Sequence, residues 1–204
     1  MRSVQVFEAF QKDFVPGYPL IGDGKTIVLY GPPCSGKTTL SKLIADRYKL
    51  HRLSLDALRK SFNGKELFTN KNNSEVLKLF LDELRFLHER RQSVICEGFF
   101  FSAERKKQLI DAVNGDEVLF IYLTADLEVL KERLAKRIII GDNLEGNPAE
   151  PLTFLKLKEF YDKFHPCNYT DLKINTENST AIVIEKKIID YIENAFDLTA
   201  ENKG

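Results

Sequence analysis

Residues 31–38 read Gly31-Pro32-Pro33-Cys34-Ser35-Gly36-Lys37-Thr38, and this stretch says more about the fold than any other. It is a complete G-x-x-x-x-G-K-[ST] pattern. The two glycines let the backbone curl so that successive N–H groups point at one anion. Lys37 places a cation between the outer phosphates of a nucleotide, and the Thr38 hydroxyl is a ligand for Mg²⁺. We therefore expect residues 31–39, ending at Thr39, to bind a nucleotide's phosphates.

The segments on either side of this loop fit that prediction. Residues 26–30, Thr-Ile-Val-Leu-Tyr, form a short apolar run that is typical of a buried parallel strand. After the loop, apolar side chains fall on one face of a predicted helix: Leu40, Leu43, Ile44 and Tyr48. The N-terminus of this helix would add its positive end to the phosphate site.

Strand and helix patterns then alternate along the chain. Further strands are expected at residues 50–54, 93–96, 117–123 and 172–174. The intervening helices are expected to begin near Ser74, Ser102, Asp126 and Ser179, with a further apolar face at Phe154, Leu157, Tyr161 and Phe164. This order predicts an α/β fold with a parallel sheet of about five strands, helices on both faces and a helical lid. In such sheets ligands bind at the carboxyl ends of the strands.

The 204 residues suit one domain. We assign residues 25–195 to it, residues 1–24 to an N-terminal extension and residues 196–204 to a C-terminal tail. The extension carries Phe7, Phe10 and Phe14 at helical spacing. We expect these side chains to pack on the flank of the domain, with a partner surface or a cap over the substrate as the alternative.

The bulk composition excludes several classes of protein. The formal net charge is zero, with 30 basic and 30 acidic residues, so no overall field attracts long nucleic acids or anionic membranes. The three cysteines have no metal-like spacing and are expected to be reduced thiols. The chain opens without a basic-then-apolar segment and has no run long enough to span a bilayer. We therefore expect a cytoplasmic protein that has no membrane partner.

Asp56 and Arg59 follow the second predicted strand and lie three residues apart. That spacing places both side chains on one side of a helix. Asp56 is a candidate to accept the proton of an attacking hydroxyl, and Arg59 is a candidate to hold an anion on the acceptor. The plainer interpretation is a surface ion pair or a charge at a helix N-terminus.

Arg133 and Arg137 lie four residues apart on the helix that follows the fourth strand. Both are at the edge of its apolar face and can lean toward the site. The glycine- and proline-bearing segment 141–151 is long enough to act as a lid, and arginines beside it can stabilise charge on a transferred phosphoryl group. The alternative is a solvated basic face, on which charge pairs contribute little.

The third strand ends in Glu97-Gly98-Phe99, followed by Phe100 and Phe101. Glu97 is a candidate partner of the Mg²⁺ shell or a group that orients the acceptor. Phe99 is the candidate to stack on an acceptor ring, although core packing is the plainer interpretation for each phenylalanine taken alone.

The chain resembles, over residues 26–192, the P-loop kinases that include polynucleotide 5′-hydroxyl kinases and zeta-toxin-like kinases, within the AAA-type P-loop NTPase superfamily. The motifs that carry the resemblance are residues 31–39, 55–59, 93–97 with Glu104-Arg105, 133–137 and 160–166. The first of these motifs is highly specific, and the others are moderately so.

The resemblance implies a role for each matched residue. Lys37 and Thr38 would bind ATP phosphates and Mg²⁺, Asp56 would be the general base, and Arg59 would contact an acceptor anion. Arg137 would be the lid arginine, with Arg133 in support. Many relatives carry Asp where this chain has Glu97, so the acceptor pocket is expected to differ. The Asp-x-x-Arg element and residues 171–176 are also similar to adenylylsulfate kinases and other small-molecule kinases.

The sequence therefore predicts an ATP- and Mg²⁺-dependent phosphotransferase, with residues 25–195 as the kinase domain. Its partners would be ATP and a hydroxyl-bearing acceptor, for which we favour a nucleotide or a short nucleic-acid end. The alternative within the same class is a small-metabolite kinase with an acceptor site like that of adenylylsulfate kinases. A nucleotide-binding switch or scaffold that transfers nothing is the rival from another class.

Overall fold

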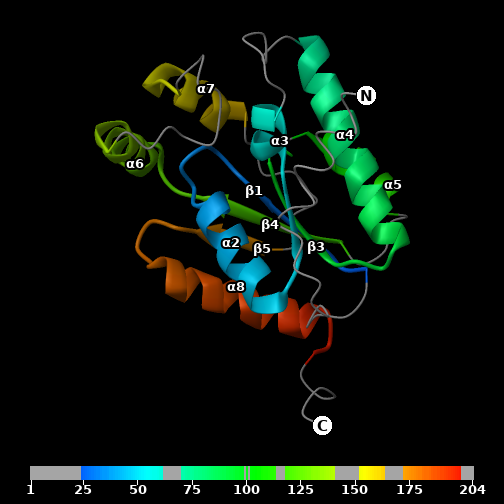
Figure 1. Cartoon of the computed structure of the whole chain (residues 1–204). Helices are drawn as coiled ribbons and strands as arrows, with labels where there is room; N and C mark the ends of the chain where they lie inside the picture. The colour runs from blue at the N-terminus through cyan, green and yellow to red at the C-terminus, as the bar shows by residue number, and fades with distance from the viewer. Residues whose placement is uncertain are drawn as a thin grey trace.

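The structure, a computed structural model, describes residues 24–61, 70–98, 100, 102–113, 118–140, 152–163 and 172–198. Five parallel strands form one sheet in the order β2-β3-β1-β4-β5 (Figure 1). Their bounds are β1 (Thr26–Tyr30), β2 (His51–Ser54), β3 (Val94–Gly98), β4 (Val118–Thr124) and β5 (Leu172–Asn175). The predicted α/β fold with a parallel sheet is confirmed.

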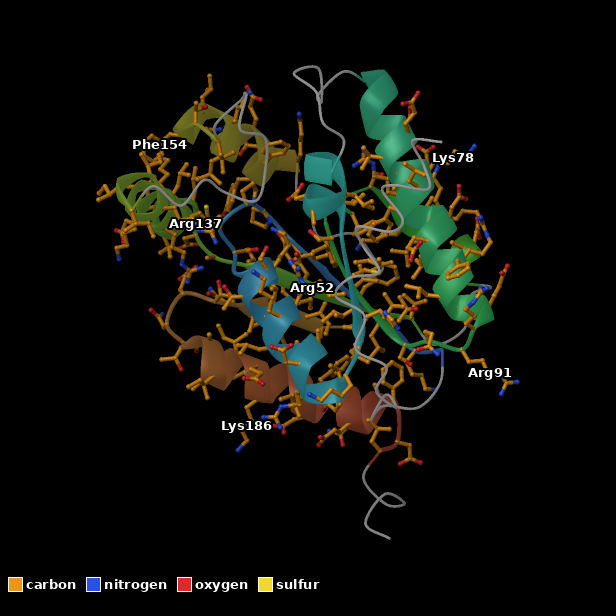
Figure 2. All side chains as sticks on the ribbon, in the orientation of Figure 1. Arg52, Lys78, Arg91, Arg137, Phe154 and Lys186 are labelled. Carbon is orange, nitrogen blue, oxygen red and sulfur yellow. The ribbon has the colours of Figure 1, made fainter. Side chains whose placement is uncertain are left out.

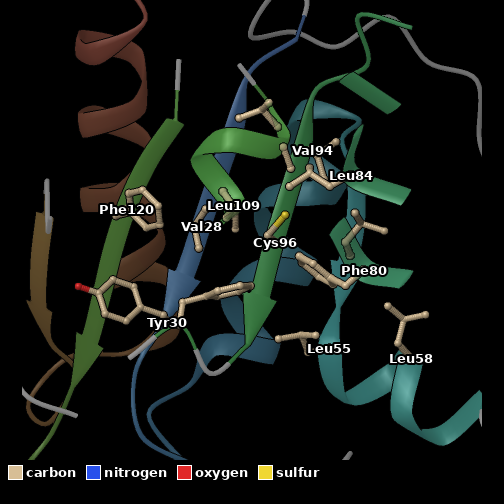
Figure 3. Close-up of a cluster of buried hydrophobic side chains, with 14 of the residues drawn as sticks. Val28, Tyr30, Leu55, Leu58, Phe80, Leu84, Val94, Cys96, Leu109 and Phe120 are labelled. Atoms are coloured by element: carbon tan, nitrogen blue, oxygen red, sulfur yellow. The ribbon is translucent and has the colours of Figure 1, made fainter. Parts of the chain in front are cut away.

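Helices cover both faces of the sheet because alternate strand residues point to opposite sides. Val28 and Tyr30 of β1 face a core built with α3 (Leu55–Ser61), α4 (Asn70–Glu89) and α5 (Ala103–Ala112). Figure 3 shows part of this core, in which Cys96 of β3 lies among apolar side chains. Ile27 and Leu29 face the other core, which is built with α2 (Lys37–Tyr48) and α8 (Ala181–Ala195).

The remaining two helices pack on each other beside the phosphate-binding loop. These are α6 (Leu127–Ile139) and α7 (Phe154–Lys163). Leu130, Leu134 and Leu157 form a small buried cluster with Cys34 of the loop. Phe154 is 47% exposed, so the apolar face predicted for this segment buries Leu157 but not its first member. The predicted lid segment, residues 141–151, lies outside the described residues.

The helix starts were predicted with mixed success. Ser102 is the N-cap of α5 and accepts a hydrogen bond from the backbone N–H of Arg105, as expected. Asp126 is the N-cap of α6, also as expected. The start predicted at Ser74 is wrong, because α4 begins at Asn70. The last helix runs from 181 to 195 with Thr180 as its cap, so it begins slightly later than the predicted start near Ser179.

The two ends of the chain are only partly described. The predicted N-terminal helix with its three phenylalanines lies outside the described residues. At the other end, Phe196 and Leu198 pack against the core between the sheet and α8. Among the described helices, none combines the length and the apolar composition that a membrane span requires.

Candidate active site

The loop between β1 and α2 has the backbone that the glycine pattern predicts. Gly31 and Gly36 have φ angles of 148° and 96°, and Cys34 has φ 64°, a left-handed value that is uncommon outside glycine. A Cβ atom on Gly31 would lie 2.0 Å from the carbonyl oxygen of Leu123 in β4. Glycine is therefore required at position 31 by the close approach of the loop to the neighbouring strand.

Lys37 is the first residue of α2, and its side chain turns back over the loop. The amine donates to the carbonyl oxygens of Gly31 at 3.0 Å and Pro32 at 2.8 Å. Burial lowers the pKa of Lys37, while the carboxylates of Asp56 and Glu97 act in the opposite direction. The cation of the loop therefore lies within electrostatic reach of both acids that the sequence analysis selected.

Asp56 and Arg59 lie on α3, which begins directly after β2 at the same edge of the sheet as the loop. They form an ion pair, and Arg59 is buried with 9% of its surface exposed. Burial raises the pKa of Asp56; the cations Arg59 and Lys37 lower it, but not enough to cancel the effect of burial. The pair is partly buried, and Asp56 interacts electrostatically with Lys37 of the loop, so it is not a solvated surface pair.

Arg105 on α5 is a candidate site residue to which the sequence analysis gave no role. Burial lowers the pKa of Arg105, and the neighbouring cation Arg59 lowers it further. The charges of two guanidinium groups from different helices, α3 and α5, therefore act on each other. Such a pair is suited to binding an anion. The available sequence signal was the Glu104-Arg105 dipeptide of the family resemblance.

Glu97, at the end of β3, is 3% exposed and is surrounded by polar partners. Arg52 of β2 forms an ion pair with one carboxylate oxygen, and the Ser41 hydroxyl of α2 lies 3.0 Å from the other. Ser41 also lies 3.1 Å from the carbonyl oxygen of Thr38. Ser41 thus lies between Glu97 and the backbone of Thr38, the predicted metal ligand. Sequence reasoning missed Arg52, whose only signal was a charge within a short strand.

Arg133 and Arg137 project from α6 on the side of the loop, but their roles differ. Arg133 donates to the carbonyl oxygen of Cys34 at 3.3 Å and to Oγ1 of Thr176 at 2.9 Å, and it also bonds the Thr176 carbonyl. It therefore ties the loop to the residue that follows β5. Arg137 lies one turn later and near the loop (Figure 2). Its charge lowers the pKa of Lys37 and opposes the burial that raises the pKa of Cys34.

The phenylalanines after β3 divide between core and undescribed chain. Phe100 is fully buried, and its ring centroid lies 5.6 Å from that of Phe80 in α4. It is a core residue. Phe99, the candidate to stack on an acceptor, lies outside the described residues, so its predicted role stays a prediction.

The loop fits the phosphates of a nucleotide. The Ser35 hydroxyl is fully buried and has no hydrogen-bond partner among the described residues, which leaves a donor for a bound group. The same part of the chain holds no cluster of three His, Cys, Asp or Glu side chains that would bind a metal by itself. This fits Mg²⁺, which is held by one or two protein groups together with substrate phosphates and water. Thr38 and Glu97 are the candidates for those groups.

Comparison with known proteins agrees with this geometry. The model of the family described as an AAA domain matches residues 27–150, more than half of the chain, so the chain belongs to that family. It is 27% identical to a putative adenylate kinase of Methanocaldococcus jannaschii over 87% of this chain and 99% of that protein. It is 28% identical to mouse threonine synthase-like 1 over 90% of this chain, which spans 24% of that longer protein.

Comparison with solved structures identifies the fold. A gluconokinase from Sinorhizobium meliloti superposes with a TM-score of 0.67 at 15% identity, over 90% of this chain and 99% of that one. The fold is that of P-loop kinases. Together with the loop and the kinase relatives, it defines an ATP-dependent kinase domain that uses Mg²⁺.

Proposed function

We propose that this kinase transfers the γ-phosphate of ATP to a hydroxyl group on an acceptor that also carries an anion, in the first place a nucleotide or a short nucleic-acid end. The observation that carries the proposal is the position of Asp56. This carboxyl group is partly buried, has a raised pKa and interacts electrostatically with Lys37 of the phosphate-binding loop. A base opposite the loop is what an in-line attack on the γ-phosphate requires.

Asp56 would accept the proton of the attacking hydroxyl. A carboxylate with a raised pKa is a stronger base than a solvated one, and its ion pair with Arg59 limits its orientation. Lys37 and Arg137 would stabilise charge on the transferred group, since both cations act at the loop. Thr38 and Glu97 would hold Mg²⁺, which when bound would neutralise part of the charge on the phosphates.

Arg59 and Arg105 support an acceptor with an anionic group. The charge of Arg59 acts on Arg105, and the nearby acids differ: Asp56 pairs with Arg59, and Glu104 acts on Arg105. Binding a phosphate or a carboxylate would relieve the repulsion between them. The net charge of zero favours a short acceptor over a long polyanion. The proposal of a relation to polynucleotide 5′-hydroxyl kinases rests on this pair and on the motifs quoted above.

A small anionic metabolite is the second candidate acceptor. The observation that favours it is that the one described phenylalanine after β3, Phe100, packs in the core and is not available to stack on a base. The arginine pair binds a carboxylate as readily as a phosphate. This candidate shares the reaction and the base with the first and differs only in the acceptor.

The test is transfer of γ-labelled phosphate from ATP to 5′-hydroxyl oligonucleotides, nucleosides, nucleotides and small hydroxy acids, with wild type and Asp56→Asn. We expect a labelled product whose formation falls by about 10²–10⁴ in the variant, because the base is lost. MgATP affinity, measured by isothermal titration, should change little.

The matched control is Asp82→Asn. Asp82 pairs with Arg85 at the same three-residue spacing on α4, but both side chains are about half exposed and lie on the solvent side. Its rate should equal that of wild type. Transfer that persists in Asp56→Asn would remove Asp56 as the base. A wild type that binds MgATP and labels none of these acceptors would instead favour the switch or scaffold.

A further inference from the structure

Three side chains from three elements form a closed polar network behind the first turn of α2. Arg52 of β2 donates from Nε to the Ser41 hydroxyl at 2.8 Å and pairs through Nη2 with Oε1 of Glu97. The Ser41 hydroxyl lies 3.0 Å from Oε2 of Glu97. Arg52 therefore holds Oε1, while the single Ser41 proton is directed either to Oε2 or to the Thr38 carbonyl oxygen, so Arg52 is the constant donor to the carboxylate (Arg52 is labelled in Figure 2).

Burial raises the free-energy cost of breaking this network above that of breaking an ordinary surface ion pair. Glu97 has 4% of its side chain exposed and Arg52 has 21%. A buried carboxylate without partners is strongly disfavoured, so removal of either donor would leave this carboxylate free to turn away from its present position. A strand pair and a helix could be held together far more simply by apolar side chains. The presence of a charged pair at this position points to a role in the site.

The network also contacts the phosphate-binding element directly. Ser41 lies one turn after Thr38 on α2, and its hydroxyl is 3.1 Å from the Thr38 carbonyl oxygen. The network therefore connects the Glu97 carboxylate, through Ser41, to the backbone of the loop residue that would contact Mg²⁺.

We propose that Arg52 is a positioning residue for the metal site. With Ser41, it holds the Glu97 carboxylate beside Thr38, so that Glu97 serves Mg²⁺ and its bound water and does not contact the acceptor. This inference rests on the proposed use of MgATP in phosphoryl transfer, and it assigns to Glu97 one of the two roles that its sequence position left open.

The test is the Mg²⁺ dependence of ATP binding. Isothermal titration gives the Kd of ATP in Mg²⁺ and in EDTA for wild type, Arg52→Met, Arg52→Lys and Ser41→Ala. We expect Arg52→Met to reduce the gain from Mg²⁺ by about tenfold, the lower end of the effect of removing a group that orients a metal ligand. The Kd in EDTA should stay nearly constant. Arg52→Lys should restore part of the gain because it keeps the charge, and Ser41→Ala should lose about threefold.

The matched control is Arg47→Met. Arg47 is also an arginine in an ion pair, but it lies in the last turn of α2, its side chain is 54% exposed, and its partner is Glu185 of α8. Its Mg²⁺ gain should equal that of wild type. A purely structural role of Arg52 would lower the melting temperature and weaken ATP binding equally in Mg²⁺ and EDTA, and that result would overturn the proposal.

The outcomes separate this inference from the proposed function. If Arg52→Met does not fold, Ser41→Ala and Arg52→Lys provide the test, since the first keeps the ion pair and the second keeps the charge. If Mg²⁺ improves the Kd of ATP as much in both variants as in wild type, the inference is overturned. ATP binding needs no acceptor, so a loss of Mg²⁺ gain supports the inference even where no phosphate is transferred. A wild type that transfers phosphate, with variants that keep the full Mg²⁺ gain, leaves the proposed function standing and removes Arg52 from the site.

Discussion

Replacement of Gly31 by alanine tests whether the phosphate-binding loop is shaped by its contact with β4. The added Cβ would lie 2.0 Å from the Leu123 carbonyl oxygen, 3.1 Å from its carbonyl carbon and 3.2 Å from the Ser35 hydroxyl. The closest of these atoms belongs to a strand that is hydrogen-bonded on both sides, so it cannot turn away as a side chain would. The loop itself must move.

The expected cost has two parts. The φ angle of 148° is one that non-glycine residues rarely adopt, which costs about 1–3 kcal/mol. The overlap adds about 1–3 kcal/mol, as extra atoms in a packed interior do. The sum, about 2–6 kcal/mol, is a large fraction of the about 5–15 kcal/mol that stabilises a typical domain. MgATP binding should be lost even where the variant folds, because a displaced backbone no longer directs its N–H groups at one anion.

The assays are urea unfolding for the free energy and isothermal titration for MgATP, with Gly36→Ala as the control. Gly36 also has a positive φ, 96°, but the nearest atom to its added Cβ is Leu40 Cδ1 at 4.0 Å. The control should therefore lose only about 1–2 kcal/mol from backbone strain. If Gly31→Ala is no less stable than Gly36→Ala and binds MgATP as wild type does, contact with β4 does not shape the loop.

Two further predictions concern the reaction. Arg137→Ala should lower kcat by about 10²-fold, with little change in the Kd of MgATP, because the charge of Arg137 acts at the transferred group. The control is Lys136→Ala, an exposed neighbour on the same turn, whose kcat should equal that of wild type. An unchanged kcat in Arg137→Ala would remove this arginine from the site. The pH profile follows from Asp56, whose burial raises its pKa above the ordinary 3.8. The base must be ionised, so kcat/KM should fall as the pH drops through the raised pKa of Asp56. The folded state binds this proton more tightly than the unfolded chain, so the free energy of unfolding should decrease as the pH rises through the same pKa. Arg59→Met removes a cation that lowers the pKa of Asp56, so the acid limb of its rate profile should lie at higher pH than that of wild type. Identical acid limbs in the two proteins would contradict the assignment of Asp56 as the base.

Local patterns predicted the elements that carry the phosphate-binding loop. The glycines and Lys37 predicted the turn between β1 and α2, and Ser102 predicted the start of α5, because these signals depend on residues close together in sequence. The start of α4 at Asn70 was missed, because Ser74 looks like a cap although the helix continues through it. Position along the chain also placed Asp56 and Arg59 at the edge of the sheet, where the structure has them.

Contacts between distant residues were not predictable in this way. Arg52 and Glu97 are 45 residues apart, and Arg133 and Thr176 are 43 residues apart. They meet because β2 pairs with β3 and β4 pairs with β5, a strand order that no local pattern specifies. The approach of Arg105 to Arg59 depends on the packing of α3 and α5 against a shared core. The two contacts and this electrostatic interaction distinguish the observed site from the list of candidates that the sequence provided.

The strand order has a consequence for how such a kinase can change its substrate. The carboxyl ends of β1, β4 and β5 carry the loop, Arg133 and Thr176, whereas those of β2 and β3 lead to Asp56, Arg59 and Arg105. Lys37 on one side and Asp56 and Glu97 on the other interact electrostatically across this division. Under the proposed function, substitutions on α3 and α5 at positions other than Asp56 would change acceptor choice and leave the nucleotide-binding loop in place, so this half of the molecule is where a new specificity would be engineered.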